Sequence, residues 1–150
     1  MKITHVVPAL TKGGGEKVAA ELANHASRSG HKTAMIVGWP VDPRLLRDTL
    51  LPDVSVVCVS KTLRSRIGRY FELVFWFWQN RELLDRQDVI HCHLSYGTVF
   101  GFLLSMRRLI TQNRTPVIVQ TNHSVGAPIS HFRRWLQSFF ARKGDALALI

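Results

Sequence analysis

The apolar positions of this chain fall into two kinds of segment that alternate along the sequence. Short apolar runs bounded by glycine, proline or polar residues are typical of strands buried on both faces of a sheet. Longer segments repeat apolar side chains every three or four residues, as one face of a helix does; Val18, Leu22 and Ala26 form one such face. The pattern predicts strands at 3–7, 33–38, 54–59, 88–92, 115–121 and 145–150, helices at 16–29, 62–84, 97–110 and 130–142, and one helical turn at 44–50.

Strands that alternate with helices favour a parallel sheet with right-handed crossovers. The predicted fold class is therefore α/β, a Rossmann-like doubly wound and mostly parallel sheet, and the 150 residues suffice for one domain. With the strand order 3-2-1-4-5-6, ligands bind outside the carboxyl ends of the first and fourth strands, where the order reverses. The residues that follow these strands are the first candidates for a ligand site.

Three consecutive glycines, Gly13 to Gly15, separate the first predicted strand from the helix that begins near Glu16. Glycine lets the backbone approach a ligand closely, and the unpaired N–H groups of a helix start attract anions. The stretch lacks the Gly-x-Gly-x-x-Gly spacing, the acidic residue that would hold a ribose, and a following Gly-Lys-Ser/Thr. These features disfavour a nicotinamide-dependent oxidoreductase and a Walker-type loop, and they favour a loop that lets a sugar diphosphate approach.

Polar side chains collect at the ends of the strands that border the predicted crevice. They follow the first, fourth and fifth strands, which the expected strand order brings to one edge of the sheet. We expect a ligand to contact several of them: Thr11, Lys12, His93, Ser95, Tyr96, Asn122, His123 and Ser124.

Two histidines of the fourth strand, His91 and His93, lie two residues apart and therefore share a face. One interpretation is a metal-binding pair, with His5 or His123 as a third ligand. No acidic residue accompanies the pair and His-x-His is unspecific, so we expect no metal. His91 lies inside the strand and is expected to pack in the core, whereas His93 is expected to face the crevice and His123 to contact the ligand.

The chain carries 20 Lys and Arg residues against 10 Asp and Glu residues, a formal net charge of +10, which predicts an anionic partner. The helix 62–84 is apolar all round in its middle, and Arg64, Arg66 and Arg69 crowd its start, where the helix dipole disfavours cations. An anionic membrane face or an acidic acceptor would offset that cost; the alternative is a set of solvated surface arginines. No recognisable nucleic-acid motif is present, so nucleic acid is not the expected partner.

The sequence carries several features of a cytoplasmic protein. Cys58 and Cys92 lie in apolar runs, as expected of reduced core thiols. The N-terminus lacks the long apolar segment of a secretory signal, and the stretch 89–106 fits a strand and a buried helix better than a membrane span. We expect a cytoplasmic protein that contacts the inner face of the membrane peripherally.

Three segments resemble, in order, motifs of the N-terminal domain of family 4 glycosyltransferases. The first is the opening strand 1–10 followed by Gly-Gly-Gly-Glu-Lys-Val-Ala-Ala-Glu-Leu-Ala at 13–23. The second is Asp-Val-Ile-His-Cys-His at 88–93, and the third is Pro-Val-Ile-Val-Gln-Thr-Asn-His at 116–123. The resemblance covers nearly the whole chain and implies the GT-B architecture, which pairs two Rossmann-like domains.

The resemblance implies retaining transfer of a sugar from a nucleotide-sugar donor to a saccharide or lipid-linked acceptor, without a metal cofactor. It places this domain on the acceptor side, with Gly13 to Gly15 near the donor phosphates and a catalytic His123 beside the reacting sugar. Ser124 departs from the glycine that many members carry after this histidine. The acceptor-binding residues that the resemblance implies are Lys12, His93, Ser95, Tyr96 and Asn122.

The nucleotide-binding domain of the family, with its paired glutamates, has no counterpart in these residues, and the last predicted strand stops at Ile150. We therefore expect one half of a two-domain enzyme that is inactive alone and whose partners are the C-terminal domain, the nucleotide sugar and the acceptor. The alternative is a non-catalytic Rossmann-like module that holds an anionic partner such as a membrane surface, an acidic polymer or nucleic acid.

Overall fold

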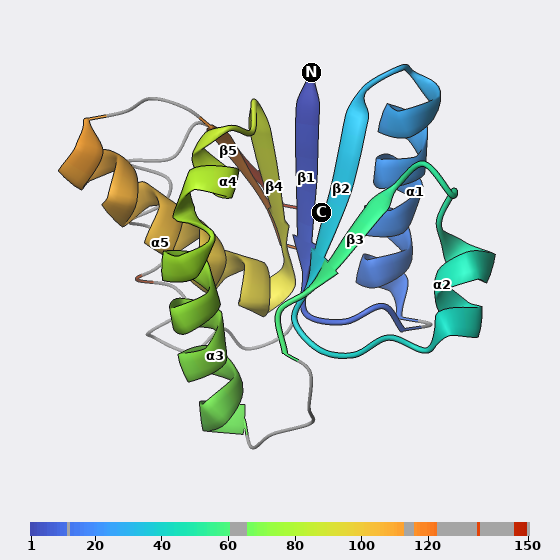
Figure 1. Cartoon of the computed structure of the whole chain (residues 1–150), viewed down its shortest axis with the longest axis horizontal. Helices are drawn as coiled ribbons and strands as arrows, with labels where there is room; N and C mark the ends of the chain where they lie inside the picture. Colours follow the sequence, from blue (N-terminus) through green and yellow to red (C-terminus); the bar gives the residue numbers. More distant parts are fainter. Residues whose placement is uncertain (12, 61–65, 113–115, 123–134, 136–145, 150) are drawn as a thin grey trace.

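The computed structural model of the chain is a parallel sheet with helices on both faces (Figure 1). It describes residues 1–11, 13–60, 66–112, 116–122, 135 and 146–149. Among these residues the strands are β1 (Lys2–Val7), β2 (Lys32–Val37), β3 (Ser55–Cys58), β4 (Val89–His93), β5 (Val117–Asn122) and β6 (Ala146–Leu149). The helices are α1 (Gly14–Arg28), α2 (Pro43–Thr49), α3 (Arg66–Gln79), α4 (Arg81–Asp85) and α5 (Leu94–Thr111).

The described strands all pair in parallel, in the order β3-β2-β1-β4-β5-β6. This is the predicted order, and the doubly wound Rossmann-like class is confirmed. The order reverses between β1 and β4, because β2 and β3 extend to one side while β5 and β6 extend to the other.

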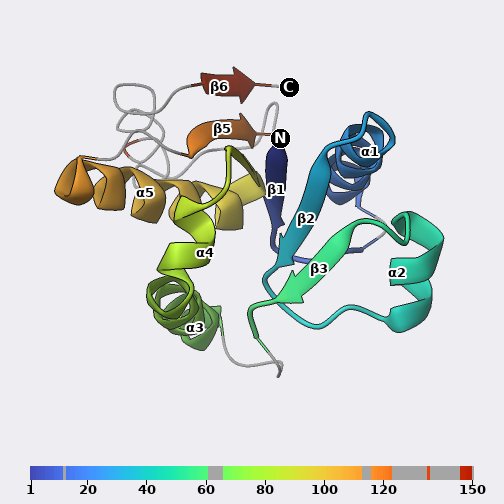
Figure 2. The same ribbon diagram turned by 45° about the horizontal axis from the view of Figure 1, so that its top comes forward.

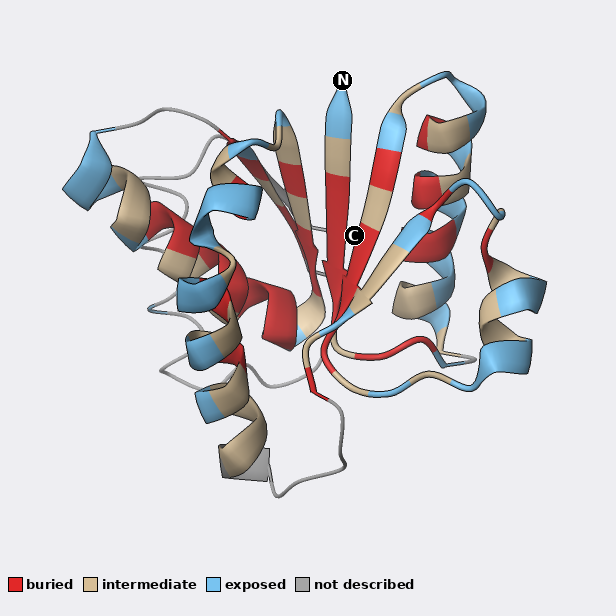
Figure 3. Cartoon of the chain, in the orientation of Figure 1, coloured by how far each residue is buried: buried red, intermediate tan, exposed pale blue. Residues whose placement is uncertain are grey.

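Different helices cover the two faces of the sheet, α1 on one side and α3 to α5 on the other (Figure 2). Val7 and Val37 pack with the buried alanines of α1, whose small side chains let the helix lie close to the strands. The preceding residues on the same strands, Val6 and Ile36, point to the opposite face and pack with Phe100 of α5. The centres of the strands are therefore buried from both sides (Figure 3).

The predicted helix 62–84 is two helices in the structure. α3 ends at Gln79 and α4 begins at Arg81, with Asn80 between them. The break lies at Asn80, whose φ of −104° and ψ of 15° depart from helical values, although its side-chain amide and its backbone N–H both donate to the carbonyl of Trp76, at 2.8 Å and 3.0 Å. The apolar periodicity continues across the break, which is why the pattern did not indicate it.

Two predicted helix starts are wrong by a few residues. α1 begins at Gly14 rather than at Glu16, and α5 begins at Leu94 rather than at Gly97. In both cases the helix follows its strand more closely than the glycines suggested. The carboxyl edge of the sheet is therefore bordered by helix starts.

Of the remaining expectations, that of two core thiols is wrong for Cys58, which is exposed, whereas Cys92 is buried as expected. The helical turn predicted at 44–50 is α2, and its N-cap Asp42 accepts a hydrogen bond from the N–H of Arg44 at 2.8 Å. The predicted helix 130–142 lies outside the described residues, apart from Trp135.

Gly97 brings α5 so close to β4 that a Cβ there would lie 2.8 Å from the backbone carbonyl carbon of Cys92. Backbone cannot yield as the tip of a side chain can, so Gly97→Ala is expected to lower the free energy of unfolding by roughly 1–3 kcal/mol. Urea denaturation followed by circular dichroism measures the difference. The matched control is Gly14→Ala, because a Cβ there meets nothing within 4 Å. Equal stability of Gly97→Ala and wild type would contradict the close packing.

Candidate functional site

The carboxyl ends of β1, β4 and β5 lie side by side at one edge of the sheet. β1 pairs with β4 so that His5 lies opposite His91, and β4 pairs with β5 so that His93 lies opposite Thr121. The glycine loop follows β1, and α5 follows β4 without an intervening residue. The segments predicted to border a crevice are thus neighbours in the fold.

The glycine loop forms the start of α1. Gly13 is the N-cap residue, with φ −71° and ψ 151°, and no side chain caps the helix. The Gly13 N–H donates to Thr11 Oγ1 at 3.3 Å, and the Gly13 carbonyl accepts from the Lys17 N–H at 3.1 Å. The space beside Gly14 is open, since a Cβ there would meet nothing within 4 Å. An uncapped, accessible helix start of this kind is suited to an anionic group.

Three side chains, His5, His91 and His93, meet at the paired ends of β1 and β4, and we call them the histidine cluster. His5 Nδ1 lies 3.2 Å from His93 Nε2. The ring of His91 lies against both others, with centroids 5.3 Å from His5 and 4.0 Å from His93. The Thr121 hydroxyl lies 2.6 Å from His91 Nε2, so the cluster links β1, β4 and β5.

Burial keeps His5 uncharged. The residue is only 3% exposed, and its pKa is lowered to about 3, first by burial and second by the nearby His91. Its Nε2 atom is buried and has no hydrogen-bond partner among the residues that the structure describes. Near neutral pH this imidazole therefore offers a lone pair and an N–H group but carries no positive charge.

The burial of His93 corrects the prediction that it faces the crevice. His93 has no exposed surface, whereas His91, expected in the core, is only partly buried. The reason is Leu94, whose φ of 60° turns the chain directly from β4 into α5. His93 is consequently both the last residue of the strand and the N-cap of the helix, and no exposed loop carries it.

Tyr96 also lies in the core, contrary to the prediction that it borders an acceptor. It is 2% exposed and packs against Trp39 and Tyr70, with ring centroids 5.4 Å and 6.4 Å away. Its hydroxyl is buried without a hydrogen-bond partner in the described part of the chain, and burial raises the pKa of that hydroxyl. Ser95, in contrast, is exposed at the start of α5.

Several predicted site residues fall wholly or partly outside the described structure. Lys12, Arg64 and His123 lie outside the described residues. Arg66 begins α3 and Asn122 ends β5, but only their backbone is described. Their predicted roles stay predictions.

Sequence reasoning missed an aromatic group beside the start of α5. Trp39 follows β2, and the guanidinium of Arg69 lies 4.6 Å from its ring centroid, a cation–π contact. Arg69, one of the arginines expected to meet an anionic partner, thus also packs against its own domain. Thr121 was missed as well, since only the strand register shows that it reaches His91.

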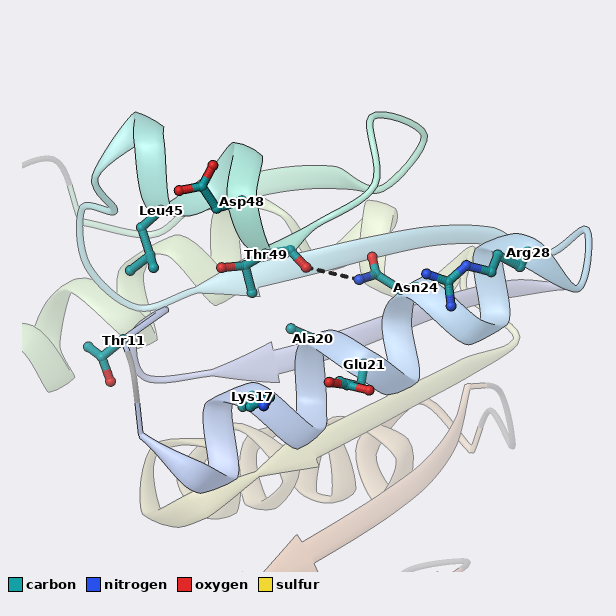
Figure 4. Close-up of a pocket in the computed structure, with 9 residues that line it drawn as sticks. All are labelled: Thr11, Lys17, Ala20, Glu21, Asn24, Arg28, Leu45, Asp48 and Thr49. Carbon is teal, nitrogen blue, oxygen red and sulfur yellow. Dashed lines mark hydrogen bonds between the residues drawn. The ribbon is translucent and has the colours of Figure 1, made fainter.

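A groove of about 550 Å³ lies between α1 and α2 (Figure 4). Asn24 ties the two sides together: its Nδ2 donates to the Thr49 carbonyl and its Oδ1 accepts from the Leu51 N–H, both at 2.9 Å. The groove has two basic and two acidic side chains in its lining, so it does not favour an anion. The lining residues are Thr11, Lys17, Ala20, Glu21, Asn24, Arg28, Leu45, Asp48 and Thr49.

Residues 12–148 match the family described as Glycosyltransferase Family 4. This chain belongs to glycosyltransferase family 4. The match covers most of the chain and includes the segments 13–23, 88–93 and 116–123, whose resemblance to the family was noted from the sequence; the opening strand 1–10 lies before it. No curated protein matches this family 4 chain.

One solved structure with a similar fold is CetZ from Methanosaeta thermophila strain DSM 6194, with a TM-score of 0.51 and 13% sequence identity. The similarity covers 99% of the family 4 chain and 45% of the other chain, so this chain spans less than half of that protein's length. At this identity the likeness concerns the fold alone. In the part of the family 4 chain that the structure describes, no helix has the length and apolar character needed to cross a membrane.

The burial of neutral His5 makes the free energy of unfolding depend on pH. The unfolded chain takes up a proton on His5 near pH 6.5, whereas the folded chain does so only near pH 3. The stability from this residue is therefore complete above pH 6.5 and is lost as the pH falls toward 3, by at most about 1.4 kcal/mol per pH unit. Urea denaturation at several pH values between about 7.5 and 5, in buffer with a chelator, measures this slope.

The variant that tests the assignment is His5→Gln, which should flatten the dependence on pH. His25→Gln is the matched control, because His25 is exposed on α1 and should leave the slope unchanged. An unaltered slope in His5→Gln would mean that other groups govern acid stability.

Proposed function

We propose that this chain is the acceptor-side domain of a retaining glycosyltransferase, which moves a sugar from a nucleotide-sugar donor to a saccharide or lipid-linked acceptor. The family 4 match over residues 12–148 carries the proposal, and the uncapped start of α1 at the carboxyl end of β1 supports it. A departing nucleoside diphosphate gathers negative charge, which preorganised N–H groups stabilise.

The proposed roles of the residues follow from the resemblance to the family. In this proposal Gly13 to Gly15 approach the donor phosphates and His123 lies beside the reacting sugar. The exposed Ser95 faces the acceptor, together with Lys12 and Asn122. His93 and Tyr96 are buried at the start of α5. In this proposal they pack beneath the acceptor-binding surface and hold it in place without contacting the acceptor.

A second domain supplies the nucleotide-binding half of the active site in this proposal. In this proposal the groups on this chain that meet the donor are backbone N–H groups and a histidine, and the transfer uses no bound metal. The isolated domain is therefore expected to have no transferase activity, and the tests below that measure transfer use the complete enzyme.

A negative charge on the glycine loop should weaken donor binding. Gly14→Glu places a carboxylate in the open space beside the helix start, where a phosphate is proposed to lie. Repulsion between like charges near a surface is expected to raise KM for the nucleotide sugar roughly ten- to hundredfold. Steady-state kinetics with both substrates varied measures this change, and KM for the acceptor should stay the same.

The matched variant for this experiment is Gly14→Ala, which adds a methyl group into the same space and should keep KM for the donor near the wild-type value. If Gly14→Glu also leaves that KM unchanged, the glycine loop does not contact the donor and the proposed geometry fails.

A second proposal concerns the outer face of α3. Phe71, Phe75 and Trp78 are 72%, 66% and 49% exposed, and their spacing puts them on one helical face. Leu73 and Phe77 on the opposite face are buried in the core. Arginines at the start of α3 and the net charge of +10 accompany this apolar face. We propose that it rests on an anionic membrane surface and brings the crevice to a lipid-linked acceptor.

The double substitution Phe71→Ser and Phe75→Ser should abolish most membrane binding. Each buried phenylalanine contributes about 2 kcal/mol, so partitioning onto vesicles that contain phosphatidylglycerol should fall at least about tenfold. Co-sedimentation measures the bound fraction. Ile110→Ser is the matched control, because Ile110 is 71% exposed on α5, outside the proposed face. Unchanged vesicle binding by the double variant would contradict the proposal. If the wild-type chain bound DNA as strongly as it binds the vesicles, the alternative of a non-catalytic anion-binding module would be favoured.

A further inference from the structure

The histidine cluster supplies one potential metal-ligand atom from each of three imidazoles, and these atoms all lie within 4.8 Å of one another. The strands fix this arrangement. His91 and His93 share one face of β4, and the register with β1 puts His5 opposite His91. The cluster is therefore a built feature of the sheet, and the proposed sugar transfer assigns it no direct contact with a reacting atom.

The shortest distance in the cluster matches that between two ligands of one metal ion. His5 Nδ1 and His93 Nε2 are 3.2 Å apart. Two nitrogens bound to a tetrahedral zinc at about 2.0–2.1 Å are separated by roughly 3.3–3.4 Å. Without a metal ion, one of these two nitrogens carries a proton and donates it to the other in a hydrogen bond. A bound cation would take the place of that proton, which would move to the second nitrogen of the same imidazole ring.

The surroundings of the cluster resemble the outer shell of a metal site. Ligating histidines are held by a hydrogen bond at the ring nitrogen that does not bind the metal. Thr121 Oγ1 lies 2.6 Å from His91 Nε2 and can hold the ring in this way. Thr121 is 2% exposed, so water does not compete strongly for that contact.

We propose that His5, His91 and His93 form a binding site for a divalent transition-metal ion such as Zn²⁺, which fastens β1 to β4. Three imidazoles without a carboxylate favour zinc, nickel or copper over magnesium or calcium. A three-histidine set leaves a further coordination position for water or another oxygen ligand. The ion stabilises the fold by binding the folded state alone.

Zinc binding by the full chain tests the proposal. After treatment with EDTA and removal of the chelator, the chain should bind one Zn²⁺ in equilibrium dialysis, and Zn²⁺ should raise the unfolding temperature whereas Mg²⁺ should not. Co²⁺ should give the visible absorption of a site with nitrogen ligands. Thr121→Val, which keeps all three ligands, should weaken Zn²⁺ binding about 10- to 100-fold.

Ligand variants distinguish a metal site from a hydrogen-bonded cluster. His91→Gln removes the half-buried ligand with the least disturbance and should abolish Zn²⁺ binding, with the fold checked by circular dichroism. His25→Gln removes an exposed histidine of α1 and should bind Zn²⁺ as wild type does. The proposal is overturned if wild type binds no Zn²⁺, if His91→Gln still binds it, or if His25→Gln loses it. These readouts are independent of sugar transfer, so they stand whether or not the proposed function holds.

Discussion

The parallel pairing of β1 with β4 is the constraint on which the rest of the structure depends. The strand order reverses at this pair, so β1 and β4 present their carboxyl ends, and the helix starts that follow them, at one place. The same register sets His5 opposite His91. Because side chains alternate between the faces of a strand, a slip of one residue would move the histidines to the other face and expose apolar residues in their place.

The alternation of apolar runs and helical stripes is enough to predict a parallel sheet, because strands buried on both faces leave a strong apolar signal. The strand order was an assumption taken from the doubly wound class, and the observed pairing agrees with it. The local details depend on contacts that periodicity does not carry. The helix is interrupted at Asn80 by a local change in backbone angles. His93 and Tyr96 are buried on either side of Leu94, which adopts a positive φ that leucine rarely takes. The sequence does not show which side chain lies opposite His5; the register between β1 and β4 shows that it is His91.

The polar groups at the carboxyl edge of the sheet are of two kinds. The exposed groups are the backbone N–H groups at the start of α1 and the side chain of Ser95 at the start of α5. The buried groups are the imidazoles of the histidine cluster, of which His5 is kept neutral by burial. The helix start and the basic side chains can therefore attract an anion, whereas the buried His5 beside them is uncharged. Such a division keeps charge away from the core while leaving polar groups close to a bound ligand.

The junction at Leu94 has a mechanical consequence. β4 passes into α5 with no connecting residue, and Gly97 presses the helix onto the backbone of Cys92. A strand and a helix that are joined directly and packed this closely are expected to move together, so a shift of β4 would carry α5 with it. Natural insertions and deletions should spare this junction, since even one added residue would separate the helix from the strand that positions it.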